Sequence, residues 1–573
     1  MKTNTILIQD KDGWLLFQDP TRIIRANLIE EVVPALIILE NQVNTGKFAA
    51  GFLSYESAHA FDPALNTHPD TDFPLLWFGL YQAPQKLTSL PVTNEDYMLG
   101  SWVSDIQLPQ YRQIINRIKT HLADGDSYQV NYTVRMRSSF SGSSFRFFQQ
   151  ISASQKACFG AYLEFENYTV CSASPELFFQ LNGDLLRSRP MKGTAPRGRY
   201  QSEDLINSRR LWNSPKDRAE NVMIVDMLRN DMGKISIPGS VEVPQLFEVE
   251  KYPTVWQMTS TVSSKTRASV TEIIRALFPC ASVTGAPKPY TMSIIRNLEV
   301  SPRKIYTGAI GMIAPERKAL FNVAIRTVLI DRNKGEAEYG VGGGIVWDST
   351  ADDEFHECEI KTRVLLQLWP DFQLIESLFW SPETGYTLMD YHLDRLVDSA
   401  RYFDYPVNRN RVQHFLKKNA QDFPETPLKV RLLLHANGMF DLRWEVPKTS
   451  DAVRIRLAKT PVDPGNIFLY HKTTNRWVYD KALAERMDAD DVILWNQRGE
   501  ITEASSSNIV LQLKDDYVTP PVNSGLLPGT RRAELMDQGK LKVKILYKTD
   551  LENADQIILI NSVRPWRKAV YLE

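Results

Sequence analysis

Ser188-Arg189-Pro190-Met191-Lys192-Gly193-Thr194 is the most informative segment of this chain, because it places a lysine beside a Gly-Thr pair after an apolar stretch. The pair predicts a turn, and an amine held in such a turn can act as a nucleophile instead of a solvated charge. A second lysine of this kind lies far downstream, in His471-Lys472-Thr473-Thr474. The chain is therefore predicted to carry two catalytic units in series.

Composition predicts a multidomain protein without affinity for polyanions. The 573 residues exceed the roughly 100–200 residues of one ordinary domain. The 67 basic residues balance 68 acidic ones, which argues against nucleic acid or an anionic membrane as a partner. The N-terminus has no signal-like apolar core, and runs such as Val32–Leu39 are too short to span a membrane. These two features lead us to expect a cytoplasmic protein. The four scattered cysteines argue against a disulfide framework or a zinc site and suit a reducing compartment.

Periodicity predicts a chain of the α/β (α+β) class. Apolar spacing indicates a helix that begins near Gln110 and stops at Asp124. Further helices are expected over 217–230 and 352–368, and 321–330 alternates like a strand.

The pattern restarts around Trp369-Pro370-Asp371, which indicates a domain boundary. We expect a first domain at 1–368, divided into an N-terminal subregion 1–105 and a catalytic core 106–368. The second domain is expected at 372–573.

Two of the predicted helices carry acids three residues apart, so that each pair shares a helix face. The pairs are Asp217 with Glu220, and Glu354 with Glu357. Mg²⁺ prefers carboxylate oxygens and usually keeps waters and a substrate anion, so one inward glutamate from each helix suits it. The alternative is that these acids form solvated helix faces.

A glycine run, 340–344, follows a strand-like segment. Backbone amides of such a run can bind a carboxylate, although an ordinary turn is equally compatible. Arg326 can clamp a carboxylate through two N–H groups, or it can form a structural ion pair.

Eight segments follow one another in a recognisable order: Gly125–Asn131, Ser174–Phe178, Pro190–Thr194, Ala219–Asp231, Ser282–Lys288, Tyr306–Gly311, Ala324–Thr327 and Gly342–Val346. In this order they resemble the chorismate-utilising family. That family includes anthranilate, isochorismate, salicylate and aminodeoxychorismate synthases.

Two positions separate the members of this family. Isochorismate- and salicylate-forming members carry a water-activating lysine where this chain has Gln129, so the resemblance implies an ammonia-using member. Anthranilate synthases usually have alanine in place of Lys192, whereas lysine marks many aminodeoxychorismate synthases. The resemblance then implies that the Lys192 amine attacks ring carbon C2 and expels the C4 hydroxyl. Ammonia next attacks C4 and releases the lysine.

The resemblance also implies roles for other residues of the first half. Glu176 is expected to be the acid/base at the departing hydroxyl, and Mg²⁺ held by Glu220 and Glu357 to neutralise the ring carboxylate. The remaining contacts to the substrate are expected from Thr284, Lys288, Tyr306, Arg326 and the backbone of Gly342 and Gly343.

Three residues depart from the family pattern. Gln257 stands where many relatives carry histidine, Ala281 replaces a frequent glycine, and Ile360 occupies an often acidic position. The first two bear on substrate contacts and the third on the surroundings of the metal. The sequence has no Gly-x-Cys-x-Gly segment, so ammonia from glutamine would need a separate glutaminase subunit.

In the second half, four features are compatible with a phosphate-bearing cofactor. Arg395 can hold a phosphate, Lys472 can offer an amine, Glu503 opens Glu-Ala-Ser-Ser-Ser-Asn, and Gly525–Arg531 is a turn whose N–H groups can bind a phosphate. Taken singly, each feature can also be an exposed charge or an ordinary turn.

Together they resemble fold-type IV pyridoxal phosphate enzymes, which include branched-chain and D-amino-acid aminotransferases and aminodeoxychorismate lyase. The resemblance implies that Lys472 forms the Schiff base and that Glu503 pairs with the pyridine nitrogen. It assigns the phosphate to Arg395 and Thr530, with Ser506 as a further contact. A lyase is favoured because the first half would supply its substrate, and Asn561–Trp566 resembles lyase-like fused chains, with Arg564 as a carboxylate contact.

We therefore expect a bifunctional enzyme that makes 4-amino-4-deoxychorismate from chorismate and ammonia, then 4-aminobenzoate and pyruvate. One alternative is an anthranilate synthase component fused to an aminotransferase of the branched-chain or D-amino-acid type. Another is a second domain that serves only for docking. A homo-oligomer formed through the second domain is compatible with each.

Overall fold

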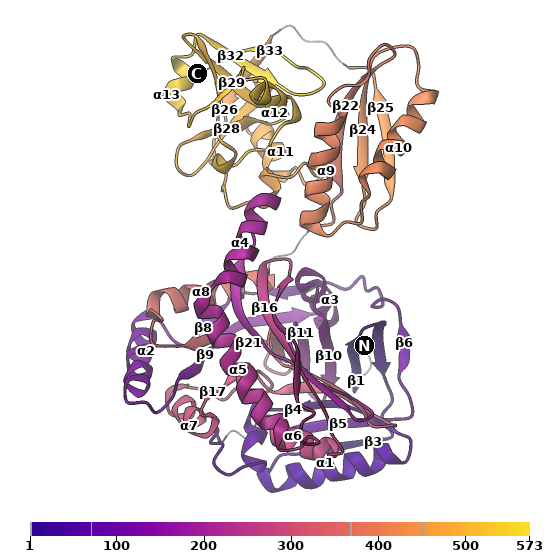
Figure 1. The fold of residues 1–573 in the computed structure, drawn as a ribbon, viewed down its shortest axis with the longest axis vertical. Coiled ribbons are helices and arrows are strands. Elements are labelled where there is room, and N and C mark those ends of the chain that lie inside the picture. Colours follow the sequence, from indigo (N-terminus) through magenta and orange to yellow (C-terminus); the bar gives the residue numbers. More distant parts are fainter. Residues whose placement is uncertain (1–2, 70–71, 367–369, 448–451, 573) are drawn as a thin grey trace. The chain divides into compact units, whose positions relative to one another are not determined.

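A computed structural model describes residues 3–69, 72–366, 370–447 and 452–572 (Figure 1). Internal contacts divide the chain into two compact units. The first comprises Met1–Pro196 and Ser208–Trp369, and the second comprises Arg197–Asn207 and Pro370–Glu573. Leu368 and Trp369, where a helix was expected to end and the pattern to restart, lie outside the described residues.

Two large antiparallel sheets form the frame of the first unit (Figure 1). Over the described residues, one sheet has 11 strands: β1 (Thr5–Asp10), β2 (Gly13–Phe17), β6 (Gln85–Leu87), β7 (Tyr97–Leu99), β8 (Val103–Ser104), β9 (Gln129–Gly142), β10 (Phe159–Phe165), β11 (Tyr168–Ser174), β17 (Gly285–Ala286), β20 (Thr327–Asp331) and β21 (Glu336–Ile345). The other has 10: β3 (Arg22–Ala26), β4 (Phe48–Leu53), β5 (Leu76–Tyr81), β12 (Leu177–Asn182), β13 (Leu185–Arg189), β14 (Met191–Pro196), β15 (Glu242–Lys251), β16 (Val255–Lys265), β18 (Ala309–Ala314) and β19 (Lys318–Val323).

Strand alternation builds three apolar layers around these sheets. In β1, Ile6 and Ile8 join a core shared by both sheets, whereas Leu7 between them faces a second core with helices. A third core lies on the opposite face of the 10-stranded sheet. The helices of this unit are α1 (Ile29–Asn44), α2 (Leu108–Ala123), α3 (Ser144–Gln155), α5 (Pro215–Gly233), α6 (Val270–Leu277), α7 (Lys288–Leu298) and α8 (Ala351–Leu366), with 3₁₀ turns η1 (Tyr55–Ala60) and η2 (Ala281–Val283).

The three predicted helices form, and their ends have local causes. At α5, the Ser214 side chain accepts a hydrogen bond from Asp217 N, and Pro215 occupies the first turn, where its missing N–H costs nothing. The helix expected from Gln110 lies within α2, which ends next to Asp124. The helix expected over 352–368 is described as α8 as far as Leu366.

The strand expected over 321–330 is wrong as a single strand. β19 ends at Val323 in the 10-stranded sheet, and β20 begins at Thr327 in the 11-stranded sheet. Between them Arg326 adopts φ 50°, a left-handed conformation that breaks strand geometry. The chain passes from one sheet to the other here. Arg326 therefore lies between the two strands and belongs to neither of their alternating faces.

The second unit contains two smaller sheets. One has β22 (Leu374–Ser381), β23 (Gly385–Tyr386), β24 (Leu428–Leu434) and β25 (Phe440–Glu445), with α9 (Met389–Phe403) and α10 (Arg409–Asn419). The other has β26 (Val453–Leu457), β27 (Asp491–Trp495), β28 (Ile501–Ala504), β29 (Asn508–Leu513), β30 (Asp516–Thr519), β31 (Lys542–Val543), β32 (Gln556–Ile560) and β33 (Arg567–Tyr571). Further elements are α4 (Gln201–Asn213), of which 201–207 belong here, α11 (Trp477–Ala484), α12 (Thr530–Asp537), α13 (Lys548–Glu552), η3 (Ala420–Asp422), η4 (Ile467–Leu469) and η5 (Val522–Ser524).

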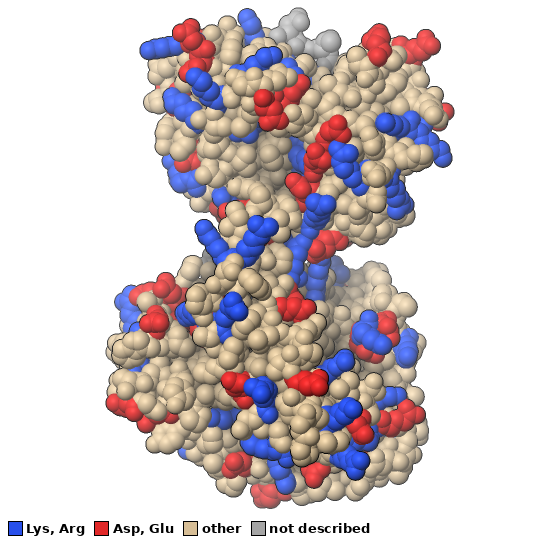
Figure 2. All heavy atoms as spheres, in the orientation of Figure 1, with Lys and Arg blue, Asp and Glu red and all other residues tan. Residues whose placement is uncertain are grey.

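Acidic and basic side chains are interspersed over the face shown in Figure 2, in keeping with 67 basic and 68 acidic residues. Within the ranges that the structure describes, every helix is too short or too polar to cross a membrane.

Candidate active sites

Lys192 lies on an irregular edge strand of the first unit. Its strand, β14, pairs with β16, and the register shifts between Met191 and Thr194. Gly193 lies within the shift and has φ 96°, which is open to glycine and strained for other residues. The expected Gly-Thr turn is therefore wrong, because the glycine distorts the strand without ending it.

The Lys192 amine is surrounded by carboxyl groups. Its Nζ lies 3.4 Å from Glu220 Oε2 on α5. Its charge also acts on the carboxyls of Glu176, Glu354 and Glu357, which places these groups near it. Acids from the two predicted helices thus meet at the lysine, as an inward-facing arrangement requires.

Gln129 is an additional neighbour of the amine. Gln129 Nε2 and Lys192 Nζ each lie 2.3 Å from the point where a β-carbon on Gly344 would stand. Gln129 is fully buried, and both its amide oxygen and its amide nitrogen lack a hydrogen-bond partner in the described part of the chain. A buried amide without partners is costly, so this group is available to a ligand beside Lys192.

Glu176 is a buried acid held in place by two donors. Its Oε1 accepts hydrogen bonds from Ser282 Oγ at 2.7 Å and from Met191 N at 3.4 Å. Burial raises the pKa of Glu176 to about 7 despite these donors. The carboxyl is thus able to hold a proton near neutral pH, as an acid/base needs.

The acids available to a metal are Glu220, Glu354 and Glu357. Glu357 is paired with Lys361 at 2.8 Å, and Glu354 accepts from Ser349 at 2.7 Å. Across the described ranges, no group of three or more His, Cys, Asp or Glu side chains gathers as a metal cage. Carboxylate oxygens are nevertheless the right donors for Mg²⁺, which needs few protein ligands when waters and a substrate anion complete its shell.

The glycine run lies inside β21 and forms no turn. The carbonyl of Gly342 accepts a hydrogen bond from Lys361 Nζ at 2.8 Å. A β-carbon on Gly343 would stand 2.9 Å from Glu354 Oε2. The run therefore lets the acids and lysine of α8 approach the sheet closely, with Lys192 beside Gly344.

Tyr306 is buried, and Arg326 is partly buried. A β-carbon on Gly340 would stand 2.2 Å from the Tyr306 ring, and burial raises the pKa of Tyr306 to about 12, so its hydroxyl stays a donor. Within the described residues, the Arg326 guanidinium has as partners the Gln155 amide oxygen at 2.8 Å and the Tyr252 ring at 5.7 Å. Its charge thus lacks a carboxylate, as expected of a group kept for a substrate anion.

Thr284 and Lys288 are engaged in local contacts. The Thr284 hydroxyl donates to the carbonyls of Cys280 and Ala281, and Lys288 Nζ pairs with Asp231 at 3.1 Å. Lys288 Nζ also donates to the carbonyl of Leu277 at 3.4 Å, so its contacts are with α5 and α6.

Gln257, which departs from the family pattern, supports the strand of Lys192. Its Nε2 donates to Gly193 O at 2.8 Å, and its Oε1 accepts from the Thr194 hydroxyl at 3.0 Å. It fixes the distorted segment at the glycine and at the residue that follows it.

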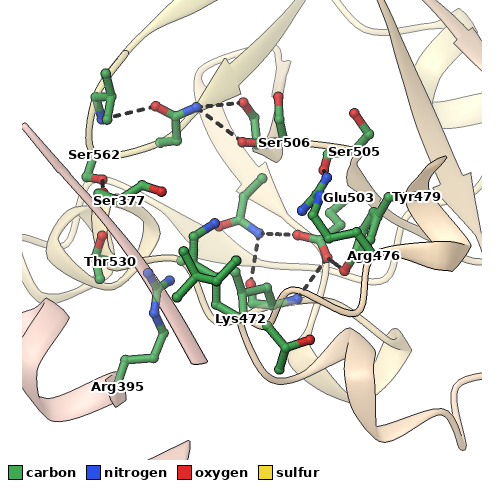
Figure 3. Close-up of a pocket in the computed structure, with 18 of the residues that line it drawn as sticks. Ser377, Arg395, Lys472, Arg476, Tyr479, Glu503, Ser505, Ser506, Thr530 and Ser562 are labelled. Atoms are coloured by element: carbon green, nitrogen blue, oxygen red, sulfur yellow. Dashed lines mark hydrogen bonds between the residues drawn. The ribbon is translucent and has the colours of Figure 1, made fainter. Parts of the chain in front are cut away.

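The second unit holds a cavity of about 230 Å³ around Lys472 (Figure 3). Basic side chains dominate its charged lining, and Glu503 is its acid. The basic residues are Arg395, Lys429, Arg431, Lys472, Arg476 and Arg564. Such a lining suits an anionic ligand.

Lys472 and Glu503 have the properties that a pyridoxal phosphate site needs. Burial lowers the pKa of Lys472 to about 8, and the nearby Arg395 acts in the same direction. Burial raises the pKa of Glu503 to about 7. Its carboxyl accepts from Tyr479 Oη at 2.8 Å and Asn508 Nδ2 at 3.2 Å, which orients it at the cavity wall (Figure 3).

Arg395 lines the cavity but is anchored by an acid that the sequence did not reveal. Its Nε and Nη2 donate to Glu376 at 2.9 and 2.6 Å, and His392 Nδ1 lies 2.6 Å from the same carboxylate. Burial alone would raise the pKa of Glu376, yet Arg395 and His392 hold it at about 2. In the sequence, Glu376 stands out only as the one acid within the largely apolar segment 374–381.

Thr530 and Ser506 lie at the edges of the same cavity. Thr530 is the first residue of α12, where free N–H groups and the helix dipole favour an anion. The Ser506 hydroxyl donates to Asp491 at 3.1 Å. Together with Arg395, Lys472 and Glu503, these residues fit pyridoxal phosphate.

Family comparisons agree with this division of chemistry. The family model described as chorismate binding enzyme matches residues 4–367, and the one described as amino-transferase class IV matches residues 373–570.

Curated relatives cover part of the chain. Aminodeoxychorismate synthase component 1 of Salmonella typhimurium is 36% identical over 305 residues, which is 53% of this chain and 65% of that protein. Anthranilate synthase component 1 of Saccharolobus solfataricus is 37% identical over 272 residues, which is 47% of this chain and 64% of that protein. The chain thus spans slightly less than two thirds of the length of these relatives.

A solved structure shares the fold of the first part. Anthranilate synthase component I from Streptococcus pneumoniae has a TM-score of 0.55 and 21% identity, over 64% of this chain and 93% of that one. The chorismate model covers well over half of the 573 residues, and the chain therefore belongs to the chorismate binding enzyme family, with a class IV amino-transferase-like domain following.

Proposed function

We propose that this chain makes 4-aminobenzoate in two steps. The first site would convert chorismate and ammonia to 4-amino-4-deoxychorismate, and the second would convert that product to 4-aminobenzoate and pyruvate. The observation that carries the proposal is the Lys192 amine, 3.4 Å from Glu220 and close to the protonatable Glu176. We assign the first activity to 1–368, with 1–105 as an N-terminal subregion and 106–368 as the core, and the second to 372–573.

In the first site, the Lys192 amine attacks ring carbon C2. The ring double bonds shift, the C4–O bond breaks, and Glu176 gives its proton to the departing hydroxyl, which leaves as water. Ammonia then forms a bond to C4, the double bonds shift back, and the bond from C2 to Lys192 breaks. A pKa near 7 keeps part of Glu176 protonated for the first step.

The substrate carboxylates have candidate partners on both sides of the lysine. Glu220 and Glu357 would hold Mg²⁺, which would neutralise the ring carboxylate when bound. Arg326, which meets no carboxylate among the residues that the structure describes, and Tyr306 would hold the other carboxylate, together with the backbone of Gly342 and Gly343. Thr284 and Lys288 would form part of the pocket wall, where their local contacts hold them in place.

In the second site, pyridoxal phosphate would supply an electron sink when bound. Arg395, Thr530 and Ser506 would hold its phosphate, and Glu503 would face its ring nitrogen. Lys472 would hold it covalently and then take the proton from C4 of the substrate. The C3–O bond would then break and the ring would become aromatic, while the departing enolpyruvate would take up that proton and become pyruvate.

The partners follow from this chemistry. The relatives named component 1 support a separate glutaminase that delivers ammonia. The balanced charge supports a protein with neither nucleic acid nor an anionic membrane as a partner, and a cytoplasmic location is part of the proposal. A homo-oligomer through the second unit is part of the proposal. The similar identity to an anthranilate synthase component keeps anthranilate formation, with an aminotransferase following, as the second candidate.

A product assay on the full chain tests the proposal. With chorismate, Mg²⁺, an ammonium salt and pyridoxal phosphate, we expect 4-aminobenzoate and pyruvate in equal amounts. Lys192→Ala should abolish both, and Lys472→Ala should let 4-amino-4-deoxychorismate accumulate. Lys234→Ala, which replaces a lysine 61% exposed, serves as the control. Anthranilate as the product would contradict the first assignment, and an inactive second site with bound cofactor would contradict the second.

A further inference from the structure

A short segment that follows Lys192 in sequence belongs to the second unit. Residues 197–207 begin five positions after Lys192, yet they pack with 370–573. Nothing in the two-step chemistry above uses them. Their contacts lead to the residues directly before Lys472.

The segment begins as a closed turn around a buried ion pair. Arg197 Nε and Nη2 donate to the two oxygens of Asp204 at 2.7 and 2.8 Å, and these side chains are 6% and 2% exposed. Gly198 N donates to the same carboxylate at 2.8 Å. A β-carbon on Gly198 would stand 2.1 Å from Asp204 N, so only glycine fits. A bidentate, buried pair of this kind fixes the backbone as well as the side chains.

The turn contacts both the side chain and the backbone of Tyr402 on α9. The Arg197 guanidinium lies 4.5 Å above the Tyr402 ring and donates to the Tyr402 carbonyl at 3.1 Å. In return, Tyr402 Oη donates to the Gly198 carbonyl at 2.6 Å. The Tyr402 ring in turn packs on His471, with ring centroids 4.5 Å apart. An unbroken chain of contacts therefore runs from Arg197 to the residue before Lys472.

His471 also contacts the segment directly. Its Nε2 lies 3.1 Å from the backbone carbonyl of Arg199, and its Nδ1 lies 2.9 Å from Ser399 Oγ. A carbonyl oxygen can only accept, so the ring proton is on Nε2, and the Ser399 hydroxyl donates to Nδ1. Burial lowers the pKa of His471 to about 3, which keeps the ring neutral in this one tautomer.

Tyr470, one residue earlier, is held by the same segment. Arg199 Nη1 donates to Tyr470 Oη at 3.0 Å, and its guanidinium lies 5.3 Å from the ring. The Tyr200 ring also packs against Tyr470, with ring centroids 5.6 Å apart. Consecutive residues of the segment thus fix consecutive residues that precede the cavity lysine.

We propose that residues 197–207 are a positioning element of the Lys472 site, which set the direction of the lysine amine through Tyr470 and His471. The second site would then be incomplete in 370–573 alone, although the elements of both its sheets lie there. The inference rests on the proposed cofactor role of Lys472, but it does not depend on the reaction being a lyase reaction.

The first test compares Arg197→Ala with Arg210→Ala in the full chain. Arg210 is an exposed residue of α4 outside the segment, so its variant is the matched control. Absorbance titration with pyridoxal phosphate should show at least tenfold weaker binding for Arg197→Ala and no change for Arg210→Ala. Borohydride trapping of the Lys472 adduct over a range of pH should show a shifted midpoint in Arg197→Ala alone. Unchanged affinity and midpoint in Arg197→Ala would overturn the proposal.

A pair of His471 variants separates positioning from packing. Glutamine can donate to the Arg199 carbonyl and accept from Ser399, whereas leucine can do neither. His471→Gln should keep cofactor binding within about threefold of the parent, and His471→Leu should lose at least tenfold. Equal binding by both variants would refute the contact as a positioning device. If the parent protein binds pyridoxal phosphate but releases no 4-aminobenzoate, the proposed lyase step is wrong. The comparison of the two His471 variants would still test the positioning role, because it measures cofactor binding alone.

Discussion

Gly344→Ala is the sharpest test of the first site, because it adds one carbon beside the amine. That β-carbon would stand 2.3 Å from Lys192 Nζ and from Gln129 Nε2, whereas ordinary contacts begin at 3.4 Å. Both side chains must therefore retreat by about 1 Å. They can do so because the crowded atoms lie at the ends of flexible chains, so the strand itself is preserved.

The expected effect is a loss of chemistry with little loss of fold. A misplacement of about 1 Å costs roughly 100-fold in rate, which corresponds to about 2.7 kcal/mol of barrier. Overpacking costs about 1–3 kcal/mol of stability, and we expect the lower end because the neighbours can yield. The assay is the initial rate of 4-amino-4-deoxychorismate formation from chorismate and ammonium, with a melting curve recorded beside it.

Gly233→Ala is the control, because a β-carbon at that position of α5 meets nothing within 4 Å. It should keep the parent rate and melting temperature. Conversion of added 4-amino-4-deoxychorismate by the second site should be unchanged in both variants. A Gly344→Ala protein that retains its synthase rate within about threefold would refute the placement of the Lys192 amine.

Three further outcomes are expected. Glu176→Gln should slow the synthase step by about 100-fold or more. Because the pKa of Glu176 is raised to about 7, the rate of the parent protein should fall as pH rises through that value. A flat pH profile of kcat/KM would contradict the acid role. Glu376→Gln leaves Arg395 without its buried partner and should destabilise the second unit by about 3–5 kcal/mol, seen as an earlier melting transition, whereas unchanged melting would refute the anchor. Because the pKa of Lys472 is lowered to about 8, the rate of adduct formation with pyridoxal phosphate should rise through pH 8, and a midpoint near 10 would show an exposed amine.

Helices were predictable because their signals are local. The apolar spacing of α2 and the Ser214-Pro215 start of α5 depend only on residues that lie close together in the sequence. The change of sheet after Val323 was not predictable, because alternation continues on both sides of Arg326 and only its left-handed backbone separates the strands. The turn predicted at Gly193-Thr194 was wrong, because a glycine with a positive φ can occur in an irregular strand as well as in a turn.

Candidate site residues could be predicted from the sequence where residue type implies chemistry, as for Lys192, Glu176 and Lys472. Glu376 was missed as a member of the second site, because one acid in an apolar strand has many structural uses. Gln129 was singled out only by its place in the family pattern, and its contact with the Lys192 region was not predicted. Their importance depends on partners distant in sequence: Gly344 for Gln129, and Arg395 for Glu376. Pattern alone cannot supply those pairings.

The buried carboxyls show why neighbours decide what such a residue does. Glu176, Glu376 and Glu503 are all nearly inaccessible to solvent, and burial pushes each pKa upward. Glu176 and Glu503 meet mainly neutral donors, so their pKa values rise to about 7 and they can exchange a proton. Glu376 faces the Arg395 guanidinium, which holds its pKa at about 2 and makes it a fixed negative charge. The same residue type in the same burial therefore becomes an acid/base or an anchor according to whether a guanidinium lies within hydrogen-bond distance.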